Sequence, residues 1–222
     1  MCVCGLSAAI CIGGCLEPSD SPGKNSWTFE NELPNERPVG WTIAATKPTA
    51  GLAKWQTQRD GDAPSNPNVL ALAHTENYDG AFNLAIAKGP AFGDFELTVQ
   101  VKAVKGEEDQ GGGPIWRCQD EDNYYTCRFN PLESNFRVYV VADGKRRQLG
   151  STHVMTRSER WYEIRVRMVG QRIECWLEGR HPLSVTDGTF SRPGHVGLWT
   201  KADAVTSFDD LRVQPLDAAA QP

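Results

Sequence analysis

"WYEIRVRMVGQRIECWLEG", residues 161–179, decides the fold class because apolar and polar residues alternate along it. On its first half the apolar positions share one face: Tyr162, Ile164, Val166 and Met168. On its second half the matching positions are Ile173, Cys175 and Leu177. A period of two is typical of half-buried antiparallel strands, and Gly170-Gln171 between the halves is a candidate hairpin turn. The stretch therefore predicts a β-hairpin with Trp176 facing outward.

The same alternation recurs along the chain. In "DFELTVQVKAVKG" the inward positions are Phe95, Leu97, Val99, Val101 and Ala103. Further strands are predicted within residues 68–74, 82–88, 135–151, 194–201 and 208–216. Helical periodicity is absent, and Gly (21) and Pro (14) are frequent, as in a turn-rich chain. These features predict an all-β sandwich or barrel.

Length and charge set the class of protein. The 222 residues suffice for one sizeable domain, which we place at residues 27–216, followed by a disordered tail at 217–222. The hydrophobic fraction of 40% is that of a globular chain. A net charge of −5 disfavours a general nucleic-acid binder, which would carry a basic patch.

The N-terminus differs in composition from the rest. Residues 1–16 are apolar and uncharged, too short for a membrane-spanning helix, which needs about 20 residues. "IGGC", ending at Cys15, resembles the bacterial lipobox, although no Lys or Arg precedes the apolar run. We therefore expect an export signal at 1–15, lipidation of Cys15, a flexible tether at 16–26 and a place at the cell envelope. The alternative is a soluble protein with a cysteine-rich N-terminus.

Two longer segments carry a resemblance to a known family. Residues 111–151 contain "NYY" and "RFNPLE", and residues 160–213 contain "GHVGLWTKAD" and "FDDLRV". The chain resembles the concanavalin A-like lectin/glucanase superfamily, in particular the bacterial 3-keto-disaccharide hydrolase or family-16-like domains. The resemblance implies a jelly-roll sandwich of two curved antiparallel sheets. This fold hosts lectins, hydrolases and inert modules, so activity must be argued from the site.

"GGGPIWRCQDEDNYYTCRFN", residues 111–130, holds two cysteines around an acidic centre. A turn at Asp122-Asn123 would place Cys118 opposite Cys127 on the apolar face of a hairpin. An exported protein can oxidise such a pair to a disulfide, and two free thiols filling core space fit the pattern equally well. Zinc is disfavoured because its site needs further ligands, and no histidine is suitably spaced.

A cation site is the one cofactor that the resemblance suggests, and no other is required. Many sugar-binding jelly rolls hold a cation between an early strand and the last one. "WTFEN" and "FDDLRV" resemble those strands, which makes Glu30, Asp209 and Asp210 candidates. Oxygen ligands suit Ca²⁺, and the alternative is a solvent-facing acidic patch.

Polar faces of the central strands are candidates for ligand binding. They carry Arg117, Arg128, Arg137, Glu163, Arg165, Arg167, Glu174 and Trp176. The family topology adds five residues, namely Asn130, Glu133, Trp199, Lys201 and Asp203. Arg and Glu can hydrogen-bond sugar hydroxyls, and a Trp ring can stack on a pyranose. The alternative is that cross-strand Arg–Glu pairs simply cover a wet sheet face.

These features lead to three function hypotheses. The first is an exported carbohydrate-binding module whose only contact with a membrane is its lipid anchor. The second is a glycoside hydrolase of the 3-keto-disaccharide hydrolase type using Glu133, Glu163 or Glu174, although the E-x-D-x-x-E strand of laminarinase-type members is absent. The third is a non-catalytic envelope interaction domain. Whether the protein is an enzyme stays open at this point.

Overall fold

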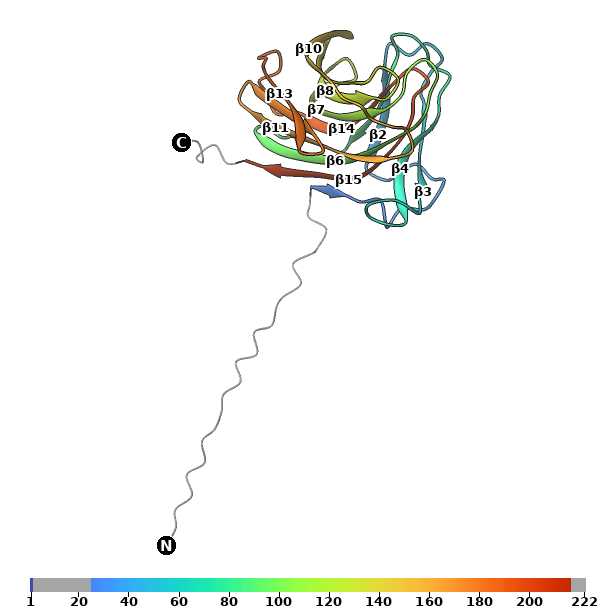
Figure 1. Ribbon diagram of the computed structural model, residues 1–222, viewed down its shortest axis with the longest axis vertical. Helices are drawn as coiled ribbons and strands as arrows, with labels where there is room; N and C mark the ends of the chain where they lie inside the picture. The colour runs from blue at the N-terminus through green and yellow to red at the C-terminus, as the bar shows by residue number, and fades with distance from the viewer. Residues whose placement is uncertain (2–24, 217–222) are drawn as a thin grey trace.

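The computed structural model describes residue 1 and residues 25–216 (Figure 1). The lipidation site at Cys15, the tether up to residue 24 and the tail at 217–222 therefore lie outside the described residues. Ser26, the last residue of the predicted tether, already belongs to a strand and pairs with Arg212. No helix forms among the described residues, and hence none long and apolar enough to cross a membrane.

The first of two antiparallel sheets, called sheet A, has the strand order β13-β12-β11-β6-β15-β4-β3, with β1 added beside β15. Its strands are β13 (Arg180–Thr186), β12 (Arg172–Leu177), β11 (Trp161–Val169), β6 (Phe95–Lys105), β15 (Val205–Pro215), β4 (Asn68–His74), β3 (Lys54–Arg59) and β1 (Ser26–Trp27). The predicted hairpin is β11–β12, in which Arg165 pairs with Trp176.

The second sheet, called sheet B, has the order β10-β9-β8-β7-β14-β5-β2. Its strands are β10 (Lys145–His153), β9 (Asn135–Ala142), β8 (Asn123–Asn130), β7 (Gly112–Asp120), β14 (His195–Lys201), β5 (Phe82–Ala87) and β2 (Trp41–Thr46). Sheets A and B pack face to face, and the two layers are visible in Figure 1. The arrangement confirms the predicted all-β sandwich.

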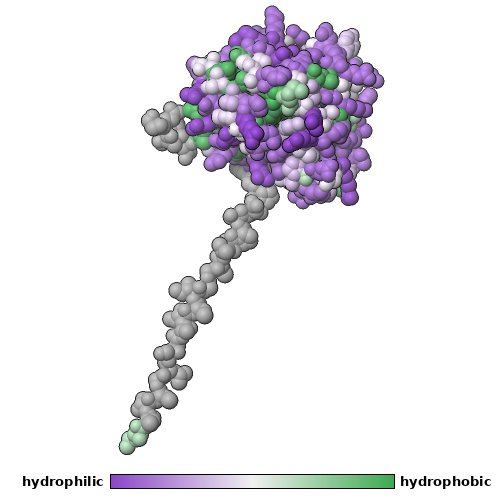
Figure 2. Space-filling view, in the orientation of Figure 1, coloured by the Kyte–Doolittle hydropathy of each residue, from purple (hydrophilic) through white to green (hydrophobic). Residues whose placement is uncertain are grey.

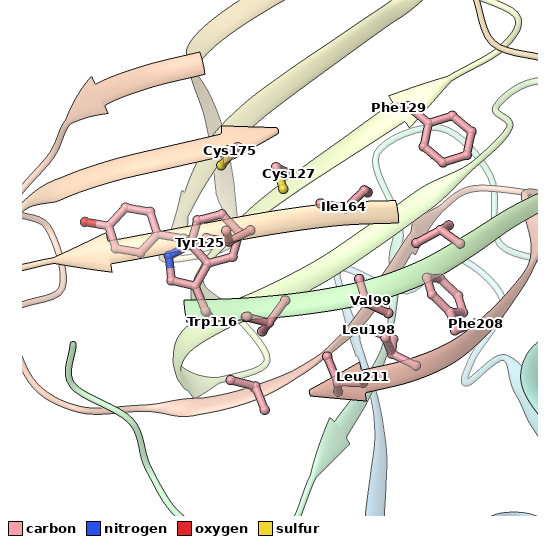
Figure 3. Close-up of a cluster of buried hydrophobic side chains, with 14 of the residues drawn as sticks. Val99, Trp116, Tyr125, Cys127, Phe129, Ile164, Cys175, Leu198, Phe208 and Leu211 are labelled. Carbon is pink, nitrogen blue, oxygen red and sulfur yellow. The ribbon is translucent and has the colours of Figure 1, made fainter. Parts of the chain in front are cut away.

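The main core lies between the sheets and follows the predicted alternation. Val99 and Ile164 of sheet A meet Trp116, Tyr125 and the other inward side chains of sheet B (Figure 3). Val99, Ile164, Trp116 and Tyr125 are all fully buried. Burial of apolar surface at about 25 cal/mol per Å² is the main force that holds the sheets together.

The β7–β8 hairpin differs from its prediction. The two-residue turn is Glu121-Asp122, one residue earlier than expected, because Asp120 pairs with Asn123. A bulge interrupts the pairing between Trp116 and Asp120, and Arg117 within it has a φ of 48°. An extra residue in one strand reverses the alternation that follows it. Cys118 is consequently turned to the outer face of sheet B, whereas Cys127 faces the main core.

The prediction that Cys118 and Cys127 share the apolar face of the hairpin is therefore wrong, since they are buried on opposite faces of the sheet. Of the two alternatives for the pair, free thiols are found in place of a disulfide. Cys127 instead lies beside Cys175 of sheet A, and both sulfurs point into the core (Figure 3). Burial raises the pKa of the Cys127 thiol, which keeps it neutral.

Sheet B curls toward its outer face, the face turned away from sheet A. The Thr46 hydroxyl of β2 lies 2.8 Å from the Tyr124 hydroxyl of β8. In a flat sheet these strands, four places apart in the order, would be separated by about 19 Å. The guanidinium carbon of Arg146 on β10 likewise lies 5.1 Å from the ring of Phe82 on β5. The outer face of sheet B is therefore concave along this diagonal.

Candidate functional site

One end of the concave face carries a connected set of charged and polar side chains, which we call the polar network: Asp109, Arg128, Asn130, Glu133, Asn135, Arg137 and Lys201. Arg128 Nη2 and Arg137 Nη1 bind the same Glu133 carboxylate oxygen, at 2.7 and 3.2 Å. Lys201 Nζ lies 3.1 Å from Oδ2 of Asp109. The other carboxylate oxygen of Asp109, Oδ1, accepts a hydrogen bond from the Asn130 amide at 2.9 Å.

The turn after β8 places Glu133 in this network. Asn130 Oδ1 accepts hydrogen bonds from the backbone N–H of Leu132 and of Glu133, at 2.8 and 3.2 Å. Such a side-chain-to-backbone turn is the usual role of Asn before a tight loop. "NPLE" in the sequence therefore fixes the chain direction that brings Glu133 back to Arg128.

Asp203 positions the opposite side of the network. Its carboxylate accepts hydrogen bonds from the backbone N–H groups of residues 107, 108 and 109. Burial opposes ionisation of Asp203, but these donors outweigh it and hold the pKa of its carboxyl below the ordinary value. Asp203 thus orients the loop that carries Asp109, and it acts through that loop.

The two carboxyl groups of the network differ in their tendency to ionise. Burial raises the pKa of Asp109, against the attraction of Arg128 and Lys201. Burial also acts on Glu133, but hydrogen bonds from Asn135 and Arg128 outweigh it and lower the pKa of Glu133 to about 2. A pair of carboxyl groups with opposite shifts is the arrangement that separates an acid role from an anionic role.

Aromatic rings fill the face beside the network. The Arg146 guanidinium carbon lies 4.5 Å from the Tyr139 ring and 6.0 Å from the Trp199 ring. Trp199 is fully buried, and its indole N–H lies 3.3 Å from the Tyr124 hydroxyl. The structure thus places the predicted Trp199 on the right face, but as a covered support for Arg146, with no surface open to a sugar ring.

Three polar atoms on this face have no hydrogen-bond partner among the described residues: the Tyr139 hydroxyl, Arg128 Nε and Arg146 Nη1. Tyr139 and Arg128 are only 3% and 1% exposed. The Tyr139 hydroxyl lies beside Arg137, yet the two are not in hydrogen-bonding geometry. Buried polar atoms normally have partners, so three such atoms together mark a place where a polar ligand can bind.

Residues 40–214 match the family described as the 3-keto-alpha-glucoside-1,2-lyase-like domain. The chain belongs to this family. No curated protein matches its sequence. The match confirms the family suggested by the sequence motifs.

Solved structures share the fold of this lyase-like domain. Carbohydrate-binding module CBM66 from Bacillus subtilis is similar with a TM-score of 0.62 and 16% identity, over 79% of this chain and 95% of that one. Cellulose induced protein Cip1 is similar with a TM-score of 0.60 and 13% identity, over 88% of this chain and 99% of that one. A third similar structure is domain 4 of AbnA, a GH43 extracellular arabinanase from Geobacillus stearothermophilus, in complex with arabinotriose. Its TM-score is 0.56 at 10% identity, over 86% of this chain and 90% of that one. These likenesses confirm the jelly roll.

The remaining predicted ligand residues of this lyase-like domain lie elsewhere. Arg165, Arg167, Trp176, Glu163 and Glu174 occupy the outer face of sheet A, on the far side of the sandwich. Trp176 faces outward as predicted, but Arg165 stacks on it at 4.2 Å and pairs with Glu96 at 3.4 Å. The candidate ligand residues therefore do not form one surface, because β11 and β12 belong to sheet A whereas β8 and β9 belong to sheet B.

Arg117 is also separate from the polar network. Its guanidinium donates to the Ser191 carbonyl at 2.6 Å and pairs with Asp94 at 3.2 Å, and the residue is buried. The bulge in β7 turns it toward this edge. Arg117 therefore supports the fold at the edge of the sandwich.

The predicted cation ligands do not converge. Asp209 accepts hydrogen bonds from Ser65 and from the backbone of Asp210, and Asp210 itself pairs with Arg212. Glu30 accepts a hydrogen bond from the backbone of Asn68. Across residues 25–216 no three His, Cys, Asp or Glu side chains form a group that could hold a metal. The predicted grouping of Glu30, Asp209 and Asp210 is thus not found.

The surface supports a polar ligand. In the view of Figure 2 it is mostly hydrophilic, with only small hydrophobic areas. Strand patterns and the family resemblance identified Arg128, Asn130, Glu133, Arg137 and Lys201 but missed four further residues of this face: Asp109, Asn135, Tyr139 and Arg146. Tyr139 could have been found, since it shares the outward parity of Arg137 on β9. Asp109 lies in a loop without a repeating pattern.

Proposed function

We propose that this protein binds carbohydrate on the concave face of sheet B. The observation that carries the proposal is the cluster of unpartnered buried polar atoms on Tyr139, Arg128 and Arg146 beside the polar network. Guanidinium N–H groups donate to sugar hydroxyls, and the carboxylate of Glu133 accepts from them. The rings below Arg146 keep these groups in place, which lowers the entropy lost on binding.

The family and the shared fold support this proposal. The family is described by a glucoside-cleaving activity, and two of the similar structures are a carbohydrate-binding module and a domain bound to arabinotriose. These neighbours suggest a saccharide as the class of ligand. Which saccharide binds must be argued from the residues of the concave face.

Tyr139→Phe tests the proposal because it removes only the hydroxyl. In a screen of immobilised polysaccharides followed by calorimetry, we expect the variant to bind the best ligand about tenfold more weakly, the loss of one hydrogen bond to a charged or fixed partner. Its melting temperature should not fall, since the hydroxyl has no protein partner.

Trp176→Ala is the matched control for an aromatic residue on the other face. It should bind like the wild type. A ligand whose affinity depends on Trp176 and is unchanged in Tyr139→Phe would show that the site lies on sheet A and would refute our assignment.

We propose lyase or hydrolase activity as the second function, favoured by the opposite pKa shifts of Asp109 and Glu133. Asp109 would serve as the proton-donating acid and Glu133 as the anion that holds Arg128 and Arg137. The substrate class that the family description suggests is the 3-keto-α-glucoside. Asp109→Asn should abolish release of the reducing sugar while retaining binding. Full turnover by the variant would exclude this role for Asp109.

We also propose that the protein is exported and anchored through a lipid on Cys15. The support is the "IGGC" motif after an apolar run. Mass spectrometry of the membrane fraction should find Cys15 with its lipid, and Cys15→Ser should move the protein to the soluble fraction. Unmodified full-length wild-type protein found only in the soluble fraction would contradict the proposal.

A further inference from the structure

Arg146 differs from the other cations of the concave face. Arg128, Arg137 and Lys201 each pair with a carboxylate of the polar network. Within the described part of the chain, Arg146 has no ion-pair partner and its Nη1 has no hydrogen-bond partner. This guanidinium therefore feels Asp109 and Glu133 only at a distance and has no carboxylate in direct contact.

The surroundings hold Arg146 in this state at a cost. Burial lowers the pKa of Arg146 and Arg128 adds repulsion, whereas attraction to Tyr139, Asp109 and Glu133 opposes this only in part. The rings of Tyr139 and Phe82, at 4.5 and 5.1 Å, offset some of the lost hydration through cation–π contact. A desolvated cation without an anion is unfavourable, so an anion that reaches it gains more than it would in water.

The unpartnered donors converge around the ring of Tyr139. The Arg128 guanidinium carbon is 5.9 Å from this ring, and Arg146 is stacked on it. Arg128 Nε, Arg146 Nη1 and the Tyr139 hydroxyl can each donate one hydrogen bond. A planar carboxylate accepts several such bonds, whereas a sugar hydroxyl brings no charge to balance Arg146.

We infer that Arg146, Tyr139 and Arg128 form a subsite for the carboxylate of an acidic carbohydrate, a uronic acid residue. The inference rests on the proposed carbohydrate binding and narrows its ligand class. Glu133, whose side chain is partly exposed, remains beside the subsite to accept hydrogen bonds from neutral hydroxyls of the same polysaccharide. The subsite thus binds the charged carboxylate of the ligand, and the polar network binds its hydroxyl groups.

Affinity electrophoresis tests the inference with matched polysaccharides. Polygalacturonate, alginate and glucuronoxylan are each compared with their carboxyl-reduced, neutral forms. The wild type should prefer at least one acidic polymer over its reduced form by about tenfold or more at low salt. Raising the salt should weaken this preference. A sulfated galactan included as a further arm distinguishes carboxylate from sulfate.

Arg146→Gln should abolish the preference for the acidic form. Arg165→Gln is the matched control, an arginine that also stacks on an aromatic ring but on sheet A, and it should retain the preference. Arg146→Lys keeps the positive charge but lacks the planar guanidinium group, and it should retain only a small part of the preference for the acidic form. This variant also decides the matter if Arg146→Gln fails to fold in a thermal unfolding assay.

Several outcomes would overturn the inference. These are equal affinity for acidic and neutral forms, a preference that persists in both Arg146 variants, or preference for the sulfated polymer alone. Binding of neutral polymers through Tyr139 would then leave the proposed function intact. Binding of no polysaccharide at all would overturn both.

Discussion

Single residues of this protein take opposite roles according to the side of the strand they occupy. Arg128 on β8 joins the polar network, while its neighbours Cys127 and Phe129 fill the core. The same separation holds for carboxyl groups. Glu133 is held as an anion by two arginines, whereas Asp209 is fully buried without a cation.

Asp209 should make stability depend on pH. Burial raises its pKa to about 6 from the ordinary 3.8, and hydrogen bonds from Ser65 oppose this only in part. Between about pH 4 and 6, the Asp209 carboxyl is protonated in the folded state and ionised in the unfolded state. Its contribution to the free energy of unfolding is therefore full below about pH 4 and is lost as the pH rises through about 6. Relative to Asp209→Asn, the wild type should lose at most about 3 kcal/mol over this window.

Urea unfolding at a series of pH values measures this difference, with the exposed Asp62→Asn as the control. The difference between the wild type and the control should be constant. A stability difference between the wild type and Asp209→Asn that is independent of pH would contradict the raised pKa.

At the scale of elements, the β7–β8 hairpin shapes the site. The bulge at Arg117 reverses the faces of β7, and the glycines before it let neighbouring backbone approach. A Cβ at Gly113 would lie 1.9 Å from the Cys127 carbonyl oxygen, and Gly111 has a φ of 92°. "GGG" is therefore required by close packing of β7 against both of its neighbours, β8 and β14.

Gly113→Ala should destabilise the domain by about 3 kcal/mol, because the atom it would meet is backbone and cannot rotate away. Gly61→Ala is the control, since nothing lies within 4 Å of its Cβ position. Chemical denaturation monitored by tryptophan fluorescence measures both. Equal stability of the two variants would show that the strands can separate at no cost.

At the scale of the whole molecule, the curl of sheet B brings distant strands together. Thr46 on β2 donates to the Glu121 carbonyl at 2.5 Å and lies 2.8 Å from the Tyr124 hydroxyl. These contacts tie the end of β2 to the β7–β8 turn across the concave face. The shape of the proposed site depends on this closure, because Tyr124 also supports Trp199 below Arg146.

Thr46→Val should lower the unfolding free energy by about 2 kcal/mol, since it keeps the side-chain shape but removes the hydrogen bonds to the Glu121 carbonyl and the Tyr124 hydroxyl. Thr42→Val, an exposed position on the same strand, is the control. Hydrogen exchange should also accelerate at the β7–β8 turn in Thr46→Val alone. Unchanged exchange at that turn would mean that the contact does not hold the diagonal closed.

Part of the site could be predicted because motif and parity act locally. Strand alternation identified Arg128 and Arg137 as polar, outward-facing residues, and the family resemblance added Asn130 and Glu133. Arg146 was missed because its contacts with Phe82 and Trp199 join strands far apart in sequence. The arginines on β11 were grouped wrongly with Arg128 and Arg137, because parity states which residues share a strand face but not which sheet the strand joins.

The sequence by itself determined the all-β class, strands such as β6, β11 and β12, the alternation that buries Val99 and Ile164, and the hairpin turn at Gly170-Gln171, because period-two burial and turn chemistry depend on near neighbours. It did not identify β2, β3 and β13. Only the tertiary structure decided that Cys118 and Cys127 face opposite ways, since no sequence pattern marks the bulge in β7, which carries one extra residue relative to β14 and two relative to β8. It also decided where the site lies. The twist and curl that bring Arg146 over Phe82 accumulate across six strands, and the burial of its charge follows from that shape.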